Sequence, residues 1–445
     1  MPVPFRKLVA LASSTLAVTV VMSSTTPAHA IQPTGYEFSG TQVTLANAET
    51  GGPALTPGLH RTQLPNDGSP RSFTINRNQL RTFVASVLTY EKNGSNLLLA
   101  DDHETEVKIT SPDGDDCDTQ KETLSEGEPA GIVVTNIGFD DDDKLSRNGY
   151  AGSTCREATT LNVTVTHSGG GDGSTDAEIL ITDEPKGVGD TGAAASAAER
   201  TAIKAPAQAP KDEVAPGTGF AGAATLTPGT YPVKLKVGAR IFYKVRLDWG
   251  QRLAATMTVP AKDSNFGSPI ALESTISIWS PQRIFLGVQP KDYRFSREAS
   301  MSANNSEVKT IGSYTAAVRW ANRSASSGDN GEIAYATVPF TSVPGWYYVS
   351  VNTQPRTPVS SDTPMPDTTP DVPAELSIAV VGEAQPGPRL VNSAGAEVAA
   401  PSAGQLSVGN GVNQDDPFPW VKTGLSAVAI IAAGAAVVWG LRRKA

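Results

Sequence analysis

The side chains with the clearest potential for chemistry are acidic and lie between positions 113 and 143. This stretch holds 11 carboxylates and one base, Lys121. Calcium prefers about six to eight hard oxygen ligands, which clustered Asp side chains can supply. The loop motif Asp-x-Asp-x-Asp-Gly is missing, however, and four successive Asp side chains cannot all face one ion. The pattern therefore favours a solvated acidic loop, with a calcium site as the alternative hypothesis. The candidate ligands are Asp113, Asp115, Asp116, Asp118, Asp140, Asp141, Asp142 and Asp143.

The chain has two cysteines, Cys117 and Cys155, which lie on either side of most of these acids. If the chain is exported to an oxidising compartment, an even count predicts one disulfide. A disulfide between them would close a loop of the unfolded chain, and the loss of chain entropy in that loop stabilises the folded state by roughly 4 kcal/mol at most. A nucleophilic or metal-binding thiol would need a positioned His or a Cys-x-x-Cys spacing, and the spacing is absent. A Cys117–Cys155 disulfide would hold both acidic clusters on one loop.

Histidines are few beyond the first 30 residues: His60, His103 and His167. No Gly-x-Ser-x-Gly elbow and no His-Glu-x-x-His motif accompanies them. We therefore expect three scattered surface histidines and no catalytic site, which predicts that the protein is not an enzyme.

A basic region follows in the second half of the chain, between positions 282 and 328. Its three acids, Asp292, Glu298 and Glu307, are outnumbered by seven bases: Arg283, Lys291, Arg294, Arg297, Lys309, Arg319 and Arg323. Opposite charge on the acidic and basic regions could dock two domains against each other or recruit anionic wall polymers. An ordinary mixed surface is the alternative. The net charge of −9 argues against a nucleic-acid partner.

The C-terminal end predicts one membrane-spanning helix over residues 420–441. Positions 423–441 are 19 residues without a charge. At about 1.5 Å per residue they reach about 28 Å, close to the ~30 Å hydrocarbon core of a bilayer. Trp420 and Trp439 lie near the two ends, and Arg442, Arg443 and Lys444 follow. The positive tail, 442–445, predicts a cytoplasmic C-terminus with the rest of the chain outside.

The N-terminal end predicts a cleaved signal peptide over residues 1–30. Arg6 and Lys7 precede an apolar run over 8–22, and Ala28-His29-Ala30 supplies the small residues that a signal peptidase requires. A second spanning helix is the alternative, but the run is short. The expected product is a single-pass protein of the plasma membrane whose ectodomain begins at Ile31.

The ectodomain contains an internal repeat. Residues 54–60 return as 225–231, and the later blocks keep their order: 73–75 matches 242–247, 83–87 matches 253–257, 107–112 matches 276–281, 163–165 matches 349–351, and 177–181 matches 374–378. Apolar and polar side chains alternate in these blocks, as a strand with one buried face requires. Pro-Gly pairs precede some of these strands and favour tight turns, because Pro fixes φ and Gly can adopt a positive φ. The pattern predicts an all-β fold of two tandem sandwiches.

Residues 229–255 resemble the bacterial pre-peptidase C-terminal domains. The resemblance rests on a Gly229-x-Tyr231 strand, an aromatic strand over 242–247, the turn Gly250-Gln251-x-Leu253 and a closing strand over 345–351. The first copy matches less well, because Asn78-Gln79 replaces Gly-Gln. The resemblance implies jelly-roll-like sandwiches without catalytic residues, used as binding or solubilising modules. Some relatives bind calcium through acidic loops, but no ligand set carries over residue by residue. Low Lys with abundant Ala, Gly and Pro resembles the composition of high-GC bacteria such as actinobacteria.

These observations divide the chain into segments: signal peptide 1–30, N-terminal extension 31–50, first sandwich 51–185, Ala/Pro linker 186–220, second sandwich 221–383, Gly/Pro/Ser-rich stalk 384–419, and then the helix and tail. The expected function is that of a non-catalytic, membrane-anchored extracellular protein that binds a cell-envelope protein or wall polymer. No cofactor is expected apart from the calcium of the alternative hypothesis. An accessory subunit of a transporter or secretion complex, or a surface peptidase, are the rival interpretations.

Overall fold

The computed structural model describes most of the ectodomain. The described residues are 35–76, 82–90, 103–124, 132–139, 153–169, 173–184, 186–189, 191–200, 203, 207–236, 239–259, 272–286, 298–301, 308–324, 338–355, 371–391 and 397–398. The predicted signal peptide, spanning helix and cytoplasmic tail lie outside them. Within these ranges, no helix has the length and apolar character needed to cross a membrane.

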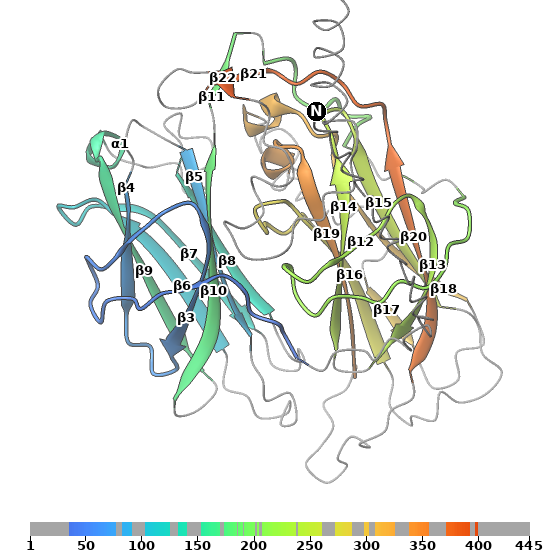
Figure 1. The fold of residues 1–445 in the computed structure, drawn as a ribbon, viewed down its shortest axis with the longest axis horizontal. Helices are drawn as coiled ribbons and strands as arrows, with labels where there is room; N and C mark the ends of the chain where they lie inside the picture. Colours follow the sequence, from blue (N-terminus) through green and yellow to red (C-terminus); the bar gives the residue numbers. More distant parts are fainter. Residues whose placement is uncertain are drawn as a thin grey trace, which may run out of the picture.

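The first repeat folds into sandwich 1, drawn in blue to green in Figure 1. Its inner sheet has the strand order β1-β3-β10-β5-β8 and its outer sheet β2-β4-β9-β6-β7. The inner strands are β1 (Thr41–Gln42), β3 (Gly58–Pro65), β10 (Ser174–Glu184), β5 (Thr82–Tyr90) and β8 (Ile132–Phe139). The outer strands are β2 (Ala54–Leu55), β4 (Arg71–Asn76), β9 (Thr160–Ser168), β6 (His103–Thr110) and β7 (Asp116–Leu124). A short helix, α1 (Ser153–Glu157), precedes β9.

The second repeat folds into sandwich 2, drawn in yellow-green to orange. Its inner sheet has the order β12-β14-β19-β16-β17 and its outer sheet β13-β20-β15-β18. The inner strands are β12 (Ala224–Thr225), β14 (Arg240–Leu247), β19 (Gly345–Pro355), β16 (Leu272–Trp279) and β17 (Glu298–Met301). The outer strands are β13 (Gly229–Leu235), β20 (Val372–Val381), β15 (Arg252–Val259) and β18 (Lys309–Tyr314).

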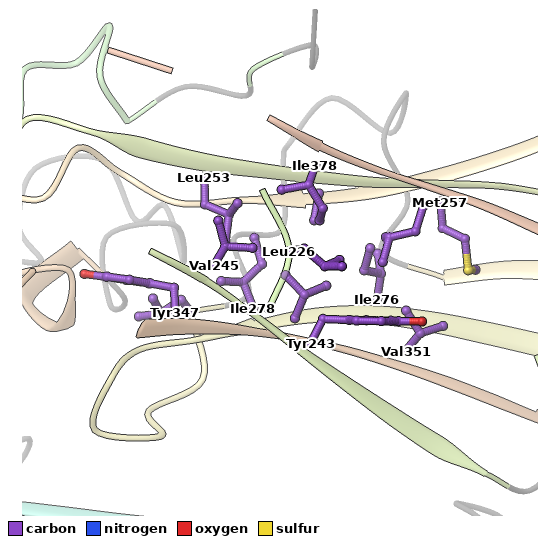
Figure 2. Close-up of a cluster of buried hydrophobic side chains, with 14 of the residues drawn as sticks. Leu226, Tyr243, Val245, Leu253, Met257, Ile276, Ile278, Tyr347, Val351 and Ile378 are labelled. Carbon is purple, nitrogen blue, oxygen red and sulfur yellow. The ribbon is translucent and has the colours of Figure 1, made fainter. Parts of the chain in front are cut away.

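Each sandwich has a core formed by every second side chain of its strands. In sandwich 1 the core includes Phe73, Ile109 and Val163, all fully buried. In sandwich 2, Tyr243, Tyr347 and the aliphatic side chains between them fill the space between the sheets (Figure 2). The alternation in the sequence therefore places one face of each strand inward, as a two-sheet fold requires.

The internal repeat is confirmed at the level of topology. Every matched block lies on strands that occupy the same position in the strand order of equivalent sheets. For example, β10 lies between β3 and β5 in the inner sheet of sandwich 1, and β20 lies between β13 and β15 in the outer sheet of sandwich 2. The register is also shared. Ile181 pairs with Gly58 and Ala85, and Ile378 pairs with Gly229 and Ala255. The prediction of two tandem β-sandwiches is thus confirmed.

The segment between the sandwiches contacts sandwich 2 along much of its length. The sequence predicts an Ala/Pro linker over residues 186–220, but its first residues form a strand, β11 (Lys186–Val188). This strand pairs with β21 (Arg389–Val391), which in turn pairs with β22 (Glu397–Val398). Pro210 then bridges to Thr230 and Gly217 to Phe242. The sequence pattern gives no sign of this because each stretch is only a few residues long and gains its partner from elsewhere in the chain. The start of the expected stalk is therefore joined to the start of the expected linker.

Candidate functional site: the junction between the sandwiches

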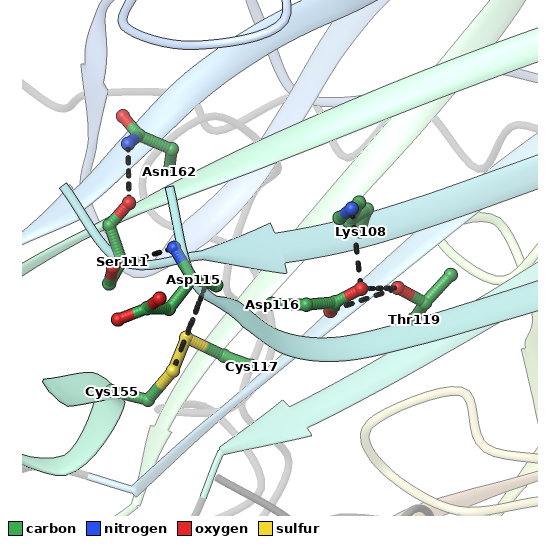
Figure 3. The surroundings of a disulfide bond; sticks show 8 residues. All are labelled: Lys108, Ser111, Asp115, Asp116, Cys117, Thr119, Cys155 and Asn162. Carbon is green, nitrogen blue, oxygen red and sulfur yellow. Dashed lines mark hydrogen bonds and ion pairs between the residues drawn. A yellow bond between two sulfur atoms is a disulfide. The ribbon is translucent and has the colours of Figure 1, made fainter. Parts of the chain in front are cut away.

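The predicted acidic site is only partly described. Asp113, Asp115 and Asp116 are exposed around the turn between β6 and β7, and Asp118 is buried. Asp116 pairs with Lys108 at 3.2 Å (Figure 3). No group of three or more metal-binding side chains converges among the described residues. The other candidate ligands, Asp140, Asp141, Asp142 and Asp143, lie outside them, so the calcium site stays a prediction.

The predicted disulfide is confirmed. Cys117 on β7 and Cys155 on α1 are bonded, with their Cα atoms 5.7 Å apart, and both residues are buried (Figure 3). The neighbouring turn is held by Ser111, whose hydroxyl accepts a hydrogen bond from the Asp115 amide at 3.0 Å. The bond therefore ties α1 to the beginning of β7 next to the acidic turn.

The expectation of surface histidines is wrong for two of the three. His60 and His167 are buried, at 8% and 0% exposure. The Nε2 of His60 lies 2.8 Å from the Thr56 carbonyl oxygen, and Nδ1 of His167 lies 3.0 Å from the Thr105 hydroxyl. Both rings occupy buried strand positions, where a hydrogen bond to a polar partner offsets the free-energy cost of removing the ring from water. The side chain of His103 lies outside the described part.

The inner sheets of the two sandwiches pack face to face, so the two sandwiches together form four stacked sheets. The evidence is burial on both faces of the central strands: residues 83–89 of β5 and 177–182 of β10 are buried without interruption. Leu88 and Val134 of sandwich 1 belong to one apolar cluster with Phe242 and Tyr348 of sandwich 2. A sheet with one wet face would instead show alternate exposed positions.

Aromatic side chains form the centre of this junction. Phe220, at 1% exposure, lies against Phe242, Tyr348 and Trp279, with ring centroids 4.9, 5.0 and 5.5 Å apart. The guanidinium carbon of Arg283 lies 4.9 Å from the centroid of the Phe220 ring. Edge contacts between rings and a desolvated cation over a ring add to the apolar burial.

A buried ion pair joins the two sandwiches at the same place. Glu178 on β10 accepts a hydrogen bond from Arg283 at 2.6 Å, and their side chains are 0% and 3% exposed. Burial alone would lower the pKa of the Arg283 guanidinium, but the Glu178 carboxylate and the nearby phenols of Tyr36 and Tyr348 together outweigh burial, so that pKa is raised. The pair is thus charged and desolvated, with each charge dependent on the other.

Arg283 is held by a tight turn after β16. The hydroxyl of Ser280 accepts hydrogen bonds from the amides of Gln282 and Ile284, and the Arg283 amide donates to the Ser280 carbonyl at 2.9 Å. Arg283 has a φ of 62°, a left-handed conformation that a residue other than glycine adopts at a cost. The turn directs a long basic side chain from sandwich 2 to the surface of sandwich 1.

Besides the aromatic cluster and the ion pair, the junction contains an N-terminal strap, which we define as residues 35–46. It enters between the sandwiches and continues along sandwich 1, where β1 pairs in parallel with β3 and Ala46 bridges to Ser72. The Tyr36 hydroxyl donates to Glu178 at 2.8 Å, and the Ser39 amide donates to the other oxygen of the same carboxylate. Burial, followed by the Glu178 charge, raises the pKa of the Tyr36 phenol well above its ordinary value.

Sequence reasoning missed Glu178, Tyr36 and Phe220. One signal was present: β10 reads Ala-Glu-Ile-Leu-Ile over 177–181, with Glu178 and Leu180 on the face opposite the core. A near-continuous apolar run of this kind is typical of strands buried on both sides. Among the described residues, the ion pair that joins the two sandwiches uses Arg283 of the basic region and Glu178, which lies outside the acidic region. Much of both regions lies outside the described residues, so docking of one region against the other stays a hypothesis.

Comparisons with known proteins add little to this description. Neither a protein-family model nor a curated protein matches the chain. Among solved structures, the tandem CBM22 domains of Paenibacillus barcinonensis Xyn10C are 8% identical, covering 72% of this chain and 86% of that one, with a TM-score of 0.19. The tandem CBM51 modules of a Streptococcus pneumoniae family 98 glycoside hydrolase are also 8% identical, covering 72% and 83%, with a TM-score of 0.19. Likenesses this weak carry no argument about function.

Proposed function

We propose that this chain is a non-catalytic, membrane-anchored extracellular protein of the bacterial cell surface that binds a wall polymer or supports an envelope protein. The junction is the observation that carries the proposal. It combines two sandwiches into one body through buried aromatic contacts and a desolvated ion pair. A fixed relation between the domains presents both outer sheets to a partner in one orientation, which lowers the entropy cost of binding.

The buried ionisable and histidine side chains support a non-catalytic role, because each of them is bonded to other residues of the fold. Glu178, Arg283 and Tyr36 are all within the junction and bonded to one another. His60 and His167 each contact a polar atom of a neighbouring residue within sandwich 1. These groups stabilise the architecture, and none of them is placed to meet a substrate from solution.

Export is the second element of the proposal. The disulfide is of the kind that forms in oxidising compartments outside the cytoplasm. The sequence at both ends predicts passage through the membrane and retention by one C-terminal helix. The resemblance of the second copy to pre-peptidase C-terminal domains agrees with a binding or solubilising module.

Partner contacts should lie on the outer sheets, because the inner sheets face each other. The outer face of sandwich 1 carries polar side chains such as Lys108, Thr164 and Thr166, which are partly exposed. Side chains of this kind can form hydrogen bonds with the hydroxyl and amide groups of a wall polymer. The inner faces could take part only after the sandwiches separate.

A sedimentation assay with isolated bacterial cell walls tests the proposal. The ectodomain, residues 31–419, is mixed with the walls and centrifuged, and soluble sugars and peptides are assayed in the supernatant. We expect saturable co-sedimentation without release of products. Triple replacement of Lys108, Thr164 and Thr166 by Glu should weaken it, whereas Ser86→Ala, inside the junction, serves as the matched control. Release of wall fragments would contradict a non-catalytic role. Absence of binding, together with no cross-linking of the full-length protein to an envelope protein in cells, would contradict the binding role.

A further inference from the structure

We propose that the N-terminal strap is a latch that determines whether the two sandwiches are docked, because it completes the set of donors to the buried Glu178 carboxylate. This proposal goes beyond the binding function, and it holds whichever partner the protein has.

The donors to Glu178 come from two separate segments of the chain. Tyr36 and Ser39 belong to the strap, and Arg283 belongs to sandwich 2. Glu178 itself belongs to sandwich 1 and is 0% exposed. A buried carboxylate needs its hydrogen bonds and its countercharge together, since a partly satisfied charge in a low dielectric is costly. The strap and sandwich 2 therefore stabilise each other's position.

The packing of the Tyr36 ring also couples the strap to both sandwiches. The Tyr36 ring lies 6.2 Å from Phe242 of sandwich 2 and 5.8 Å from Tyr90 of sandwich 1, measured between centroids. A methyl group added at Gly219 would lie 2.8 Å from the Tyr36 ring, so the ring is packed closely against that backbone. Tyr36 thus contacts both sandwiches at once, and its burial to 9% exposure depends on the docked arrangement.

A second attachment between the sandwiches, among the described residues, is at the C-terminal end of β10. This strand ends at Glu184 and β11 begins at Lys186, where it pairs with β21 and where Gly187 lies against Trp320. The chain connection at this end persists whether or not the inner faces touch. It provides a hinge, and the strap provides the latch.

Order along the chain gives the latch a consequence for maturation. The strap follows the predicted signal peptide by only a few residues, so it is among the first segments exported. Its binding partners Phe242 and Arg283 are exported much later. Docking can therefore occur only after these residues of sandwich 2 have been exported, which makes it a late step in maturation.

The test compares three forms of the ectodomain by small-angle scattering and thermal unfolding. The first lacks residues 31–40, which removes Tyr36 and Ser39 but keeps β1 and Leu45. The second is Tyr36→Phe, which removes the hydroxyl alone, and its matched control is Tyr90→Phe in the same aromatic cluster. We expect the truncated protein to show a larger radius of gyration and two unfolding transitions in place of one. Tyr36→Phe should lower the docking equilibrium constant by about 10-fold, as expected for loss of a hydrogen bond to a charge, and Tyr90→Phe should leave it unchanged.

A charge test separates the latch from simple packing. Glu178→Gln leaves Arg283 buried without its countercharge, so the docking constant should fall by at least about 100-fold. Combining it with Arg283→Met should recover much of this loss. An unchanged radius of gyration and a single transition in the truncated protein would overturn the proposal, as would equal effects of Tyr36→Phe and Tyr90→Phe. If the truncated protein fails to fold, the point variants decide the question alone.

Discussion

Replacing Phe220 by Ala should separate the sandwiches without unfolding either one. The ring is 1% exposed and contacts three other aromatic rings and the Arg283 guanidinium. Truncation of a buried Phe to Ala costs about 3–5 kcal/mol, from lost transfer energy and the cavity left behind. Phe220 lies in the junction cluster and in neither sandwich core. All four of these contact partners belong to sandwich 2, and the same cluster includes Leu88 and Val134 of sandwich 1. The cost should therefore be shared between docking and the attachment of the Phe220 ring to sandwich 2, and neither core should be affected.

The matched control is Phe73→Ala, because Phe73 is equally buried but lies in the core of sandwich 1. Calorimetry of both variants should distinguish a loss of docking from a loss of stability of the sandwich 1 core. In Phe220→Ala we expect two transitions, with each sandwich melting independently and near-UV dichroism from the junction aromatics reduced. In Phe73→Ala, which leaves the junction intact, we expect one cooperative transition that is lowered as a whole by several degrees. A single cooperative transition in Phe220→Ala, lowered as a whole, would refute the assignment of this ring to a separable junction.

Three further predictions follow from the same structure. Because the pKa of the Tyr36 phenol is raised above 10.0 in the docked state, docking should be unaffected below pH 10 and should weaken as the pH rises further, which absorbance of ionised tyrosine at alkaline pH can follow. Replacing Cys117 and Cys155 by Ser should destabilise sandwich 1 by roughly 4 kcal/mol or less, measured by urea unfolding, and mass spectrometry of the unreduced wild type should recover one linked peptide. If the acidic residues bind calcium, the ion at 100 times its dissociation constant should stabilise sandwich 1 by about 2.7 kcal/mol, whereas a melt unchanged between millimolar calcium and chelator would leave only the solvated loop.

The strands could be predicted because their signal is local. Alternation over 177–181 and 374–378, and the Pro-Gly turns before β3 and β13, encode one buried face and a chain reversal within a few residues. Comparing the two repeats then aligned the strands that occupy the same place in each sandwich. The cysteine pair was predictable for a different reason, since two thiols in an exported chain have one possible pairing.

The junction could not be predicted because its partners are distant in the chain. Glu178 and Arg283 are 105 residues apart, and Tyr36 is 142 residues from Glu178. Nothing in the local sequence of Arg283 distinguishes it from the other bases of its region. The strand β11 was missed for the same reason, since three residues acquire strand geometry only by pairing with β21.

The most direct test of the central claim is small-angle scattering of the wild-type ectodomain, residues 31–419, in solution. If the sandwiches form one body, a single docked arrangement with flexible chain ends should reproduce the whole scattering curve, unchanged across salt concentrations because the Glu178–Arg283 pair is buried. A curve that requires a distribution of distances between two independent sandwiches would contradict the account.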